Sequence, residues 1–227
     1  MSIFHTATLT CPNCGAGNEI ERVASVNAGR RPDLRAAILD RSFQAIACEA
    51  CATPLRLPPH LTYVDMARGN WILVEDSAEL PNWLTHDAAA KALFDDMFGP
   101  SAAASAREMA EGIRPRIVFG WPALREKILC TELGLDDVEI ELLKIAMMRR
   151  IDGIPVGGGL SLRLVGGTAD SLTFEITDDE TEESQGSADI PRGVYDGIAA
   201  DTAGWSALRA RFAAETLVDT ARLTLEG

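Results

Sequence analysis

The sequence predicts an α+β fold in three parts: a β-rich domain over residues 1–83, a helical segment over 84–150 and a small αβ part over 151–227. Two Cys-X-X-Cys pairs lie among short β-rich stretches of the first part. Apolar residues then recur with helical spacing. After a run of three glycines at 157–159, strand-like and helix-like stretches alternate.

Composition limits the classes of function. The chain has 227 residues, enough for a substantial core, and 34 acidic against 21 basic residues give a net charge of −13. This charge disfavours binding to nucleic acid or to an anionic membrane. No apolar stretch of about 18 residues is present, and the first residues do not resemble a signal peptide. Five cysteines then indicate a reducing compartment, so we expect a cytoplasmic protein.

In the first part, β-branched and aromatic residues predict strands at 19–27, 43–47, 62–66 and 70–75. A short helix is expected at 32–40, between the first two strands.

The middle part reads as helices at 87–98, 101–112, 121–133 and 136–150, with a short strand at 115–119. Gly99 and Pro100 end the first helix, and Ser101 is the expected N-cap of the second.

Helix 136–150 has two apolar stripes, formed by Val138, Leu142 and Ile145 and by Ile140, Leu143 and Met147. A helix apolar on two sides is either buried between layers of its own chain or placed at a subunit contact. A homo-oligomer through 136–150 is therefore left open.

In the last part we expect a hairpin of strands 160–165 and 171–177, helices at 191–200 and 205–215, and a final strand at 221–225. The acidic run 178–183 and the polar residues after it are expected to form a solvated loop.

The feature with chemical content is the pair of motifs CPNC and CEAC, which contribute Cys11, Cys14, Cys48 and Cys51 and lie 33 residues apart. Two such turns complete a tetrahedral shell of four thiolates, which suits one structural Zn²⁺ and leaves no open position. We therefore expect these four residues to be the metal ligands of a zinc-ribbon-like β domain. Gly15 follows the first pair, where the turn needs positive φ, whereas Ala52 follows the second.

Three alternatives compete with zinc. CPNC alone is also a thiol-redox motif, but that reading needs one pair opening a helix and leaves the second pair unexplained. Iron–sulfur clusters use four cysteines in more crowded runs. Unligated core cysteines would not form two matched pairs.

The segments CPNCG, RRPDLRAAILDRSFQAIACEAC and PLRLPPHLTYVD resemble the CpXC family, which is named for its Cys-Pro-X-Cys motif. The resemblance covers about residues 8–83 and extends to about 150. It places Cys11, Pro12 and Cys14 in the naming motif, and Cys48 and Cys51 in the second pair. It supports the cysteine cluster and the domain boundary and implies no activity.

No catalytic or cofactor-binding residue is predicted. Cys130 is a lone helical cysteine without a neighbouring base in the sequence, and His5, His60 and His86 show no metal-binding spacing. Asp136 and Asp137 are expected to decorate a helix end. The arginines between the cysteine pairs are interleaved with acids, so a solvated face is favoured: Arg22, Arg30, Arg31, Arg35 and Arg41.

The function expected from these residues is that of a zinc-stabilised, non-catalytic interaction or adaptor protein with a protein partner, because a closed four-cysteine site organises a surface rather than activating water. The alternatives are an enzyme with a site in the C-terminal part, or a thiol-redox protein that uses Cys11 and Cys14. A weaker alternative is nucleic-acid contact through the arginines of residues 22–41.

Overall fold

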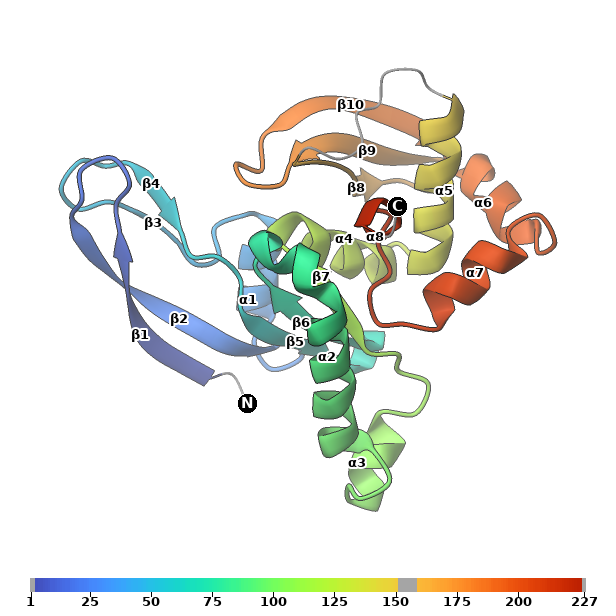
Figure 1. Cartoon of the computed structure of the whole chain (residues 1–227), viewed down its shortest axis with the longest axis horizontal. Helices are drawn as coiled ribbons and strands as arrows, with labels where there is room; N and C mark the ends of the chain where they lie inside the picture. Colours follow the sequence, from blue (N-terminus) through green and yellow to red (C-terminus); the bar gives the residue numbers. More distant parts are fainter. Residues whose placement is uncertain (1–2, 151–158, 226–227) are drawn as a thin grey trace.

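A computed structural model describes residues 3–150 and 159–225, and it has the expected α+β architecture (Figure 1). The larger sheet contains β1 (Ile3–Thr10), β2 (Gly17–Asn27), β5 (Leu61–Asp65), β6 (Asn70–Glu75) and β7 (Arg116–Phe119), in that order. The smaller sheet has the order β10 (Ser184–Pro191), β9 (Ser171–Asp178), β8 (Leu160–Gly167). A separate hairpin pairs β3 (Ala45–Ala47) with β4 (Pro54–Arg56).

The first strands of the larger sheet extend beyond its other members. β2 pairs with β5 only through Ser25, Val26 and Asn27, whereas it pairs with β1 along nearly its whole length. The rest of the β1–β2 hairpin therefore projects from the body, with the β3–β4 hairpin beside it (Figure 1). We call these two projecting hairpins the arm.

Helices cover both faces of the body of this sheet. α1 (Pro32–Leu39) and α4 (Trp121–Glu132) pack on one face around Ile38, Tyr63 and Leu124. α2 (Trp83–Phe98) packs on the other face, around Trp71. β6 is buried along its whole length, as expected for a strand covered on both sides. β7 pairs in parallel with β6, so the sheet continues past the boundary predicted at residue 83.

α5 (Asp137–Arg150) lies between two layers of the C-terminal half. Its stripe Ile140, Leu143 and Met147 packs in the cluster that contains the three-stranded sheet. Its other stripe, Val138, Leu142 and Ile145, packs with Phe212 of α7 (Ser206–Ala213) and with partly buried Ile198 of α6 (Arg192–Ala200). Burial within one chain therefore accounts for both stripes. The predicted glycine boundary at 157–159 falls mostly outside the described residues.

Several predicted elements are wrong. Residues 222–225 form a helix, α8 (Arg222–Leu225), instead of a strand, because Asp219 caps the turn by accepting from the backbone N–H of Ala221. β10 replaces part of the expected loop, and β1 was missed because its polar threonines hide a strand held by its pairing with β2. Ser101 caps no helix: α3 (Ala104–Met109) begins after Ala103.

Among the described residues, no helix combines the length and apolar character needed to cross a membrane.

Candidate metal centre

The four paired cysteines lie at the tips of the two arm hairpins. The first turn joins β1 to β2, and the second joins β3 to β4. Both turns have the same backbone pattern: Cys11 N–H donates to Ala16 O and Cys48 N–H to Thr53 O, each at 2.9 Å. Two distant sequence segments are thus folded into equivalent turns whose cysteine side chains converge.

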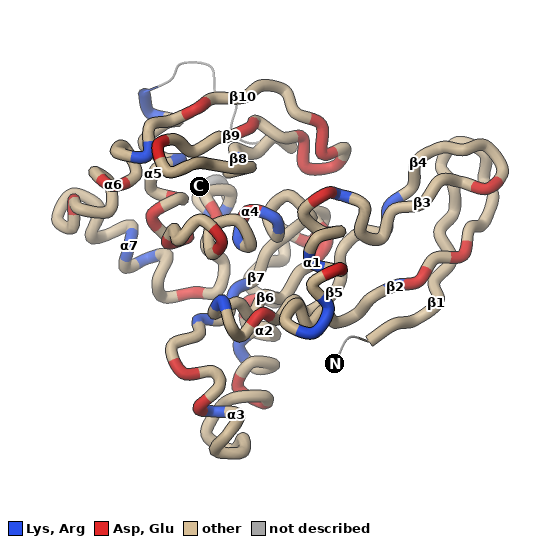
Figure 2. Tube along the Cα trace, turned by 180° about the vertical axis from the view of Figure 1, so that it is seen from behind, with Lys and Arg blue, Asp and Glu red and all other residues tan. Residues whose placement is uncertain are grey.

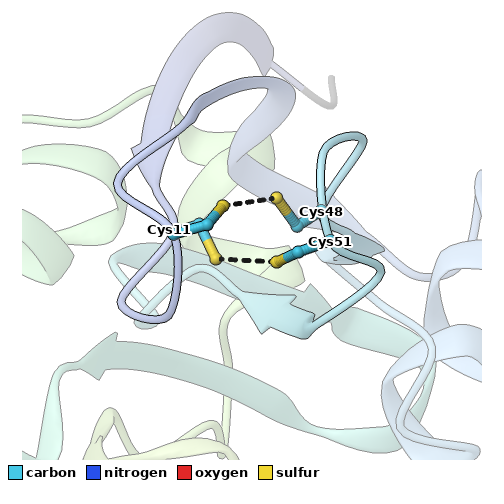
Figure 3. A group of neighbouring side chains, drawn as sticks. Cys11, Cys48 and Cys51 are labelled. Carbon is cyan, nitrogen blue, oxygen red and sulfur yellow. Dashed lines mark hydrogen bonds between the residues drawn. The ribbon is translucent and has the colours of Figure 1, made fainter.

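The sulfur atoms form a compact group. All four Sγ atoms lie within 4.8 Å of one another. Across the two turns, Cys11 Sγ is 3.6 Å from Cys51 Sγ (Figure 3). Cys14 Sγ is 3.7 Å from Cys48 Sγ. A tetrahedral zinc ion with Zn–S bonds of about 2.3 Å separates its sulfur ligands by about 3.8 Å. The four residues therefore fit a metal ion of this size.

The charges of the group also favour a cation. The hydroxyl and the backbone N–H of Thr53 lower the pKa of Cys51 to about 6. The backbone N–H of Ala16 lowers the pKa of Cys14, but the contacts with Cys51 and the other thiols outweigh it and raise this pKa to about 12. Four adjacent thiolates repel one another, so full deprotonation needs a bound cation.

Two asparagines brace the turns against each other, and sequence reasoning missed both. Asn18 is 2% exposed; its Oδ1 accepts from Glu49 N–H at 2.9 Å and its Nδ2 donates to Ala16 O at 3.0 Å. Asn13, inside the first motif, donates to Thr53 Oγ1 at 3.2 Å. Both asparagines are polar residues in or beside the first cysteine pair, which was the only sequence signal for this role. Their partners Glu49 and Thr53 lie more than 30 positions away, so the contacts could not be predicted.

The apolar core around the cysteines is small. Cys11, Cys48 and Leu55 are buried together, with Leu9, Ala16 and Ile46 partly buried against them. So few apolar side chains stabilise a projecting two-hairpin arm only weakly. A metal ion bound to the four sulfurs would give the arm a further source of stability.

The residues after the two turns differ, and this leads to a testable prediction. Gly15 and Ala52 both have left-handed backbones, with φ of +75° and +58°. A Cβ at Gly15 would meet nothing within 4 Å, so conformational strain alone should decide the effect. We expect Gly15→Ala to lower the free energy of arm opening by about 1 kcal/mol and Ala52→Gly to raise it by up to about 1 kcal/mol, measured by hydrogen exchange.

The control for this pair is Gly193→Ala in α6, which should leave arm exchange unchanged. If both substitutions changed the free energy of arm opening in the same direction, backbone strain at these two residues would not explain the effects.

The remaining sequence candidates lie elsewhere. Cys130 is 1% exposed and burial raises the pKa of its thiol, so it stays protonated and packs as a core residue. His60 Nδ1 contacts Glu75 Oε2 at 2.7 Å, and His86 Nδ1 lies 3.6 Å from Glu75 Oε1. The only group of three or more candidate ligands close enough to hold a metal, among the described residues, is the cysteine cluster.

One prediction about acidic residues is incomplete and another is wrong. Asp137 lies in the first turn of α5, as expected, but its carboxylate is also paired with Arg116 at 2.8 Å and with Lys127 at 3.1 Å. The run 178–183 is not wholly solvated, because the side chain of Glu182 is only 12% exposed and is paired with arginines. In both cases the cationic partners come from other elements, brought close by the fold.

The arginines between the cysteine pairs have acidic neighbours. Arg31 pairs with Asp33 at 2.6 Å, Arg35 pairs with Glu132, and Arg41 lies 3.8 Å from Glu175. Figure 2 shows the two signs interspersed along the chain. This pairing agrees with the mixed-charge face favoured from the sequence.

A cleft of about 1420 Å³ lies beside the smaller sheet, lined by residues that include Arg163, Asp179 and Asp219. These three charged groups are partnered: Arg163 Nη1 donates to Asp219 Oδ2 at 2.6 Å, and Asp179 accepts from Ser161. Arg163 also pairs with Glu126, which is fully buried beside Lys144 and Glu141. The floor of the cleft is thus one side of a buried ion network.

A comparison with models of known protein families found a match. The family described as "CpXC protein" matches residues 9–144, which include both cysteine pairs, α4 and most of α5. Searches of curated proteins and of solved structures found no match to the chain. Since the match covers more than half of the 227 residues, the chain belongs to the CpXC family.

Proposed function

We propose that the protein is a zinc-stabilised, non-catalytic interaction or adaptor protein, with one Zn²⁺ held by Cys11, Cys14, Cys48 and Cys51. The observation that carries this proposal is the sulfur tetrad, whose contacts across the turns of 3.6 and 3.7 Å match the edges of a zinc–thiolate tetrahedron. Four sulfur ligands saturate zinc, so the metal would hold two hairpins together rather than activate water.

The position of the site supports a role in binding other proteins. The cysteine turns lie at the end of the arm, away from the helices that cover the sheet (Figure 1). A metal there fixes the shape of a projecting surface without contributing to the core of the body. This arrangement resembles an interaction module more than a protein redox site, which needs one attacking thiol and one partner.

Metal analysis tests the proposal. We expect the full chain, purified without added metal, to carry one zinc per molecule by plasma mass spectrometry, and we expect a thiol-specific mercurial to release it. Removal of the metal should expose four titratable thiols and increase hydrogen exchange in residues 3–22 and 44–57, where the arm hairpins lie.

The same experiment separates the alternatives. Stoichiometric iron would keep the site but change the metal. Protein without metal that forms a reversible Cys11–Cys14 disulfide under mild oxidant would contradict the proposal and favour the thiol-redox alternative.

An enzyme in the C-terminal part is the second candidate, and the cleft of about 1420 Å³ is the observation that favours it. Burial there raises the pKa of Asp179, which is the kind of perturbation that functional carboxyls show. The pairing of Arg163 with Asp219 and Glu126 gives these charges a structural role as well. The adaptor proposal is therefore preferred.

A further inference from the structure

Three arginines from separate elements converge on one acidic residue, two on its carboxylate and one on its backbone carbonyl. Glu182, in the turn between β9 and β10, accepts from Arg56 Nη1 at 2.8 Å through Oε1 and from Arg125 Nη2 at 2.5 Å through Oε2. Arg41 Nη1 donates to the backbone carbonyl of Glu182 at 3.2 Å. We call Arg41, Arg56 and Arg125 the arginine cluster. It joins the segment after α1, the end of β4 and the first turns of α4.

The cluster has more donors than Glu182 can satisfy. Arg125 is 7% exposed, yet its Nη1 atom is buried and has no hydrogen-bond acceptor among the described residues. Arg56 Nη2 is in the same position. The second nearby carboxylate, Glu175, reaches only Arg41, at 3.8 Å. Buried donors without acceptors are costly, so these atoms indicate a site built for more acceptor oxygens than one carboxylate provides.

Space for a ligand adjoins these donors. A cavity of about 130 Å³ is lined by Arg41, Arg125 and Arg163 together with Thr177, whose buried hydroxyl also lacks a partner among the described residues. The large cleft borders Arg41, Arg56 and Glu182 from the other side. A liquid water molecule occupies about 30 Å³, so the cavity has room for a small oxyanion.

The electrostatics of the cluster point the same way. Burial lowers the pKa of Arg56 and of Arg125, and the charge of a neighbouring arginine lowers each further, although Glu182 opposes this. Arg56 and Arg125 are thus crowded in a poorly solvated place around the carboxylate of Glu182, and the half-exposed Arg41 adds a third positive charge at its edge. A salt bridge that only fastened the β9–β10 turn to the body would need one arginine, whereas two contact this carboxylate and a third contacts the backbone carbonyl.

We propose that the arginine cluster is a binding site for an oxyanion, a phosphoryl or carboxylate group, and that Glu182 fills it in this structure as an internal competitor. Guanidinium groups bind such oxyanions through paired N–H donors, and three of them around one point provide the geometry that a tetrahedral phosphoryl group or a carboxylate needs. Displacement of the acidic turn would open the site to the ligand.

The competitor makes the two kinds of substitution act in opposite directions. Removal of the Glu182 charge should make the site more available and strengthen binding, because a competing occupant lowers apparent affinity by the fraction of sites it fills. Removal of an arginine should weaken binding. If the salt bridges of Glu182 were purely structural, removal of the Glu182 charge would not strengthen oxyanion binding.

The test is calorimetric titration of the full-length protein with inorganic pyrophosphate, and separately with malonate, at constant ionic strength. We expect the Glu182→Gln variant to bind the probe about tenfold or more tightly than the wild type. The double variant that also carries Arg125→Gln should bind about tenfold or more weakly than Glu182→Gln alone. Glu183→Gln makes the same charge change at an exposed neighbour in the turn and should bind like the wild type.

Arg41→Gln keeps the test decisive if Arg125→Gln fails to fold, since the Arg41 side chain is 46% exposed. It should also weaken binding in the Glu182→Gln background. Binding of pyrophosphate alone supports the site and assigns it to phosphoryl groups, and binding of malonate alone supports it and assigns it to carboxylates. No gain from Glu182→Gln with either probe, or an equal gain from Glu183→Gln, overturns the proposal.

Discussion

Cys48→Ser is expected to abolish stoichiometric metal binding and to unfold the arm while the body stays folded. Structural zinc contributes about 10 kcal/mol or more to small metal-dependent modules, and the few apolar side chains around Cys11 and Leu55 cannot replace it. The body has its own core on both faces of the sheet, around Tyr63 and Trp71. Zinc content, and hydrogen exchange resolved by segment, measure the two effects.

The matched control is Cys130→Ser, which makes the same change at a cysteine buried in the core below the three-stranded sheet. It should cost a few kcal/mol of global stability at most and leave the metal in place. A Cys48→Ser protein that kept one zinc and a protected arm would show that Cys48 is not a ligand.

The structure also sets how far this loss extends. The sequence alone predicts one zinc-dependent domain up to residue 83. In the structure, β5 and β6 belong to a sheet that is covered by α1 and also by α2 and α4, so their stability depends in part on helices that extend beyond that boundary. We therefore expect the unfolding to be confined to the two hairpins. The sequence could not show this, because the pairing of β6 with β7 joins residues more than 40 positions apart.

The elements that the sequence predicted well are those with a local signal. The strand at 70–75 is β6 with the same bounds, and helix 136–150 is α5 within one residue. The two Cys-X-X-Cys turns were identified because the two-residue spacing within each motif brings the two sulfurs of that turn together. The elements that were missed depend on distant partners: β1 on β2, β10 on β9, and the arginine partners of Glu182 on three other segments.

The buried ion network was invisible for the same reason. In the sequence, Glu126, Lys144, Arg163 and Asp219 are ordinary charged residues spread over nearly 100 positions. Only the packing of α4 against β8 and against α5 shows that these residues meet in a buried place. Glu126 also accepts from the backbone N–H of Leu164 at 2.7 Å, which satisfies an edge group of β8. The network thus joins α4, α5 and β8 to the C-terminal segment through the pairing of Arg163 with Asp219.

Lys144→Met is expected to lower the free energy of unfolding by about 3–5 kcal/mol, because it leaves two buried carboxylates without their shared cation. Lys144 is fully buried, and its Nζ donates to Glu126 Oε2 at 2.7 Å and to Glu141 Oε1 at 2.8 Å. Burial lowers the pKa of Lys144, but Glu126 and Glu141 outweigh it and raise this pKa, so the amine is charged. Urea denaturation followed by circular dichroism measures the loss.

An unpaired charge and a packing defect differ in which second substitution should rescue the variant. Methionine fills a similar volume, so a defect of packing would persist when Glu141 is also changed, whereas a defect of charge should be largely relieved by Glu141→Gln in the same chain. The glutamine carbonyl can still accept from Thr220 N–H, which Glu141 Oε2 accepts at 2.8 Å. Lys91→Met is the control for the substitution itself, because the Lys91 side chain is 45% exposed and its buried partner Asp87 keeps two hydrogen bonds from Thr216, so loss of this pair should cost about 1 kcal/mol. If Lys144→Met cost no more than Lys91→Met, the network would contribute little to stability. If Glu141→Gln failed to restore the loss, cavity or shape effects around α5, rather than unpaired charge, would be its cause.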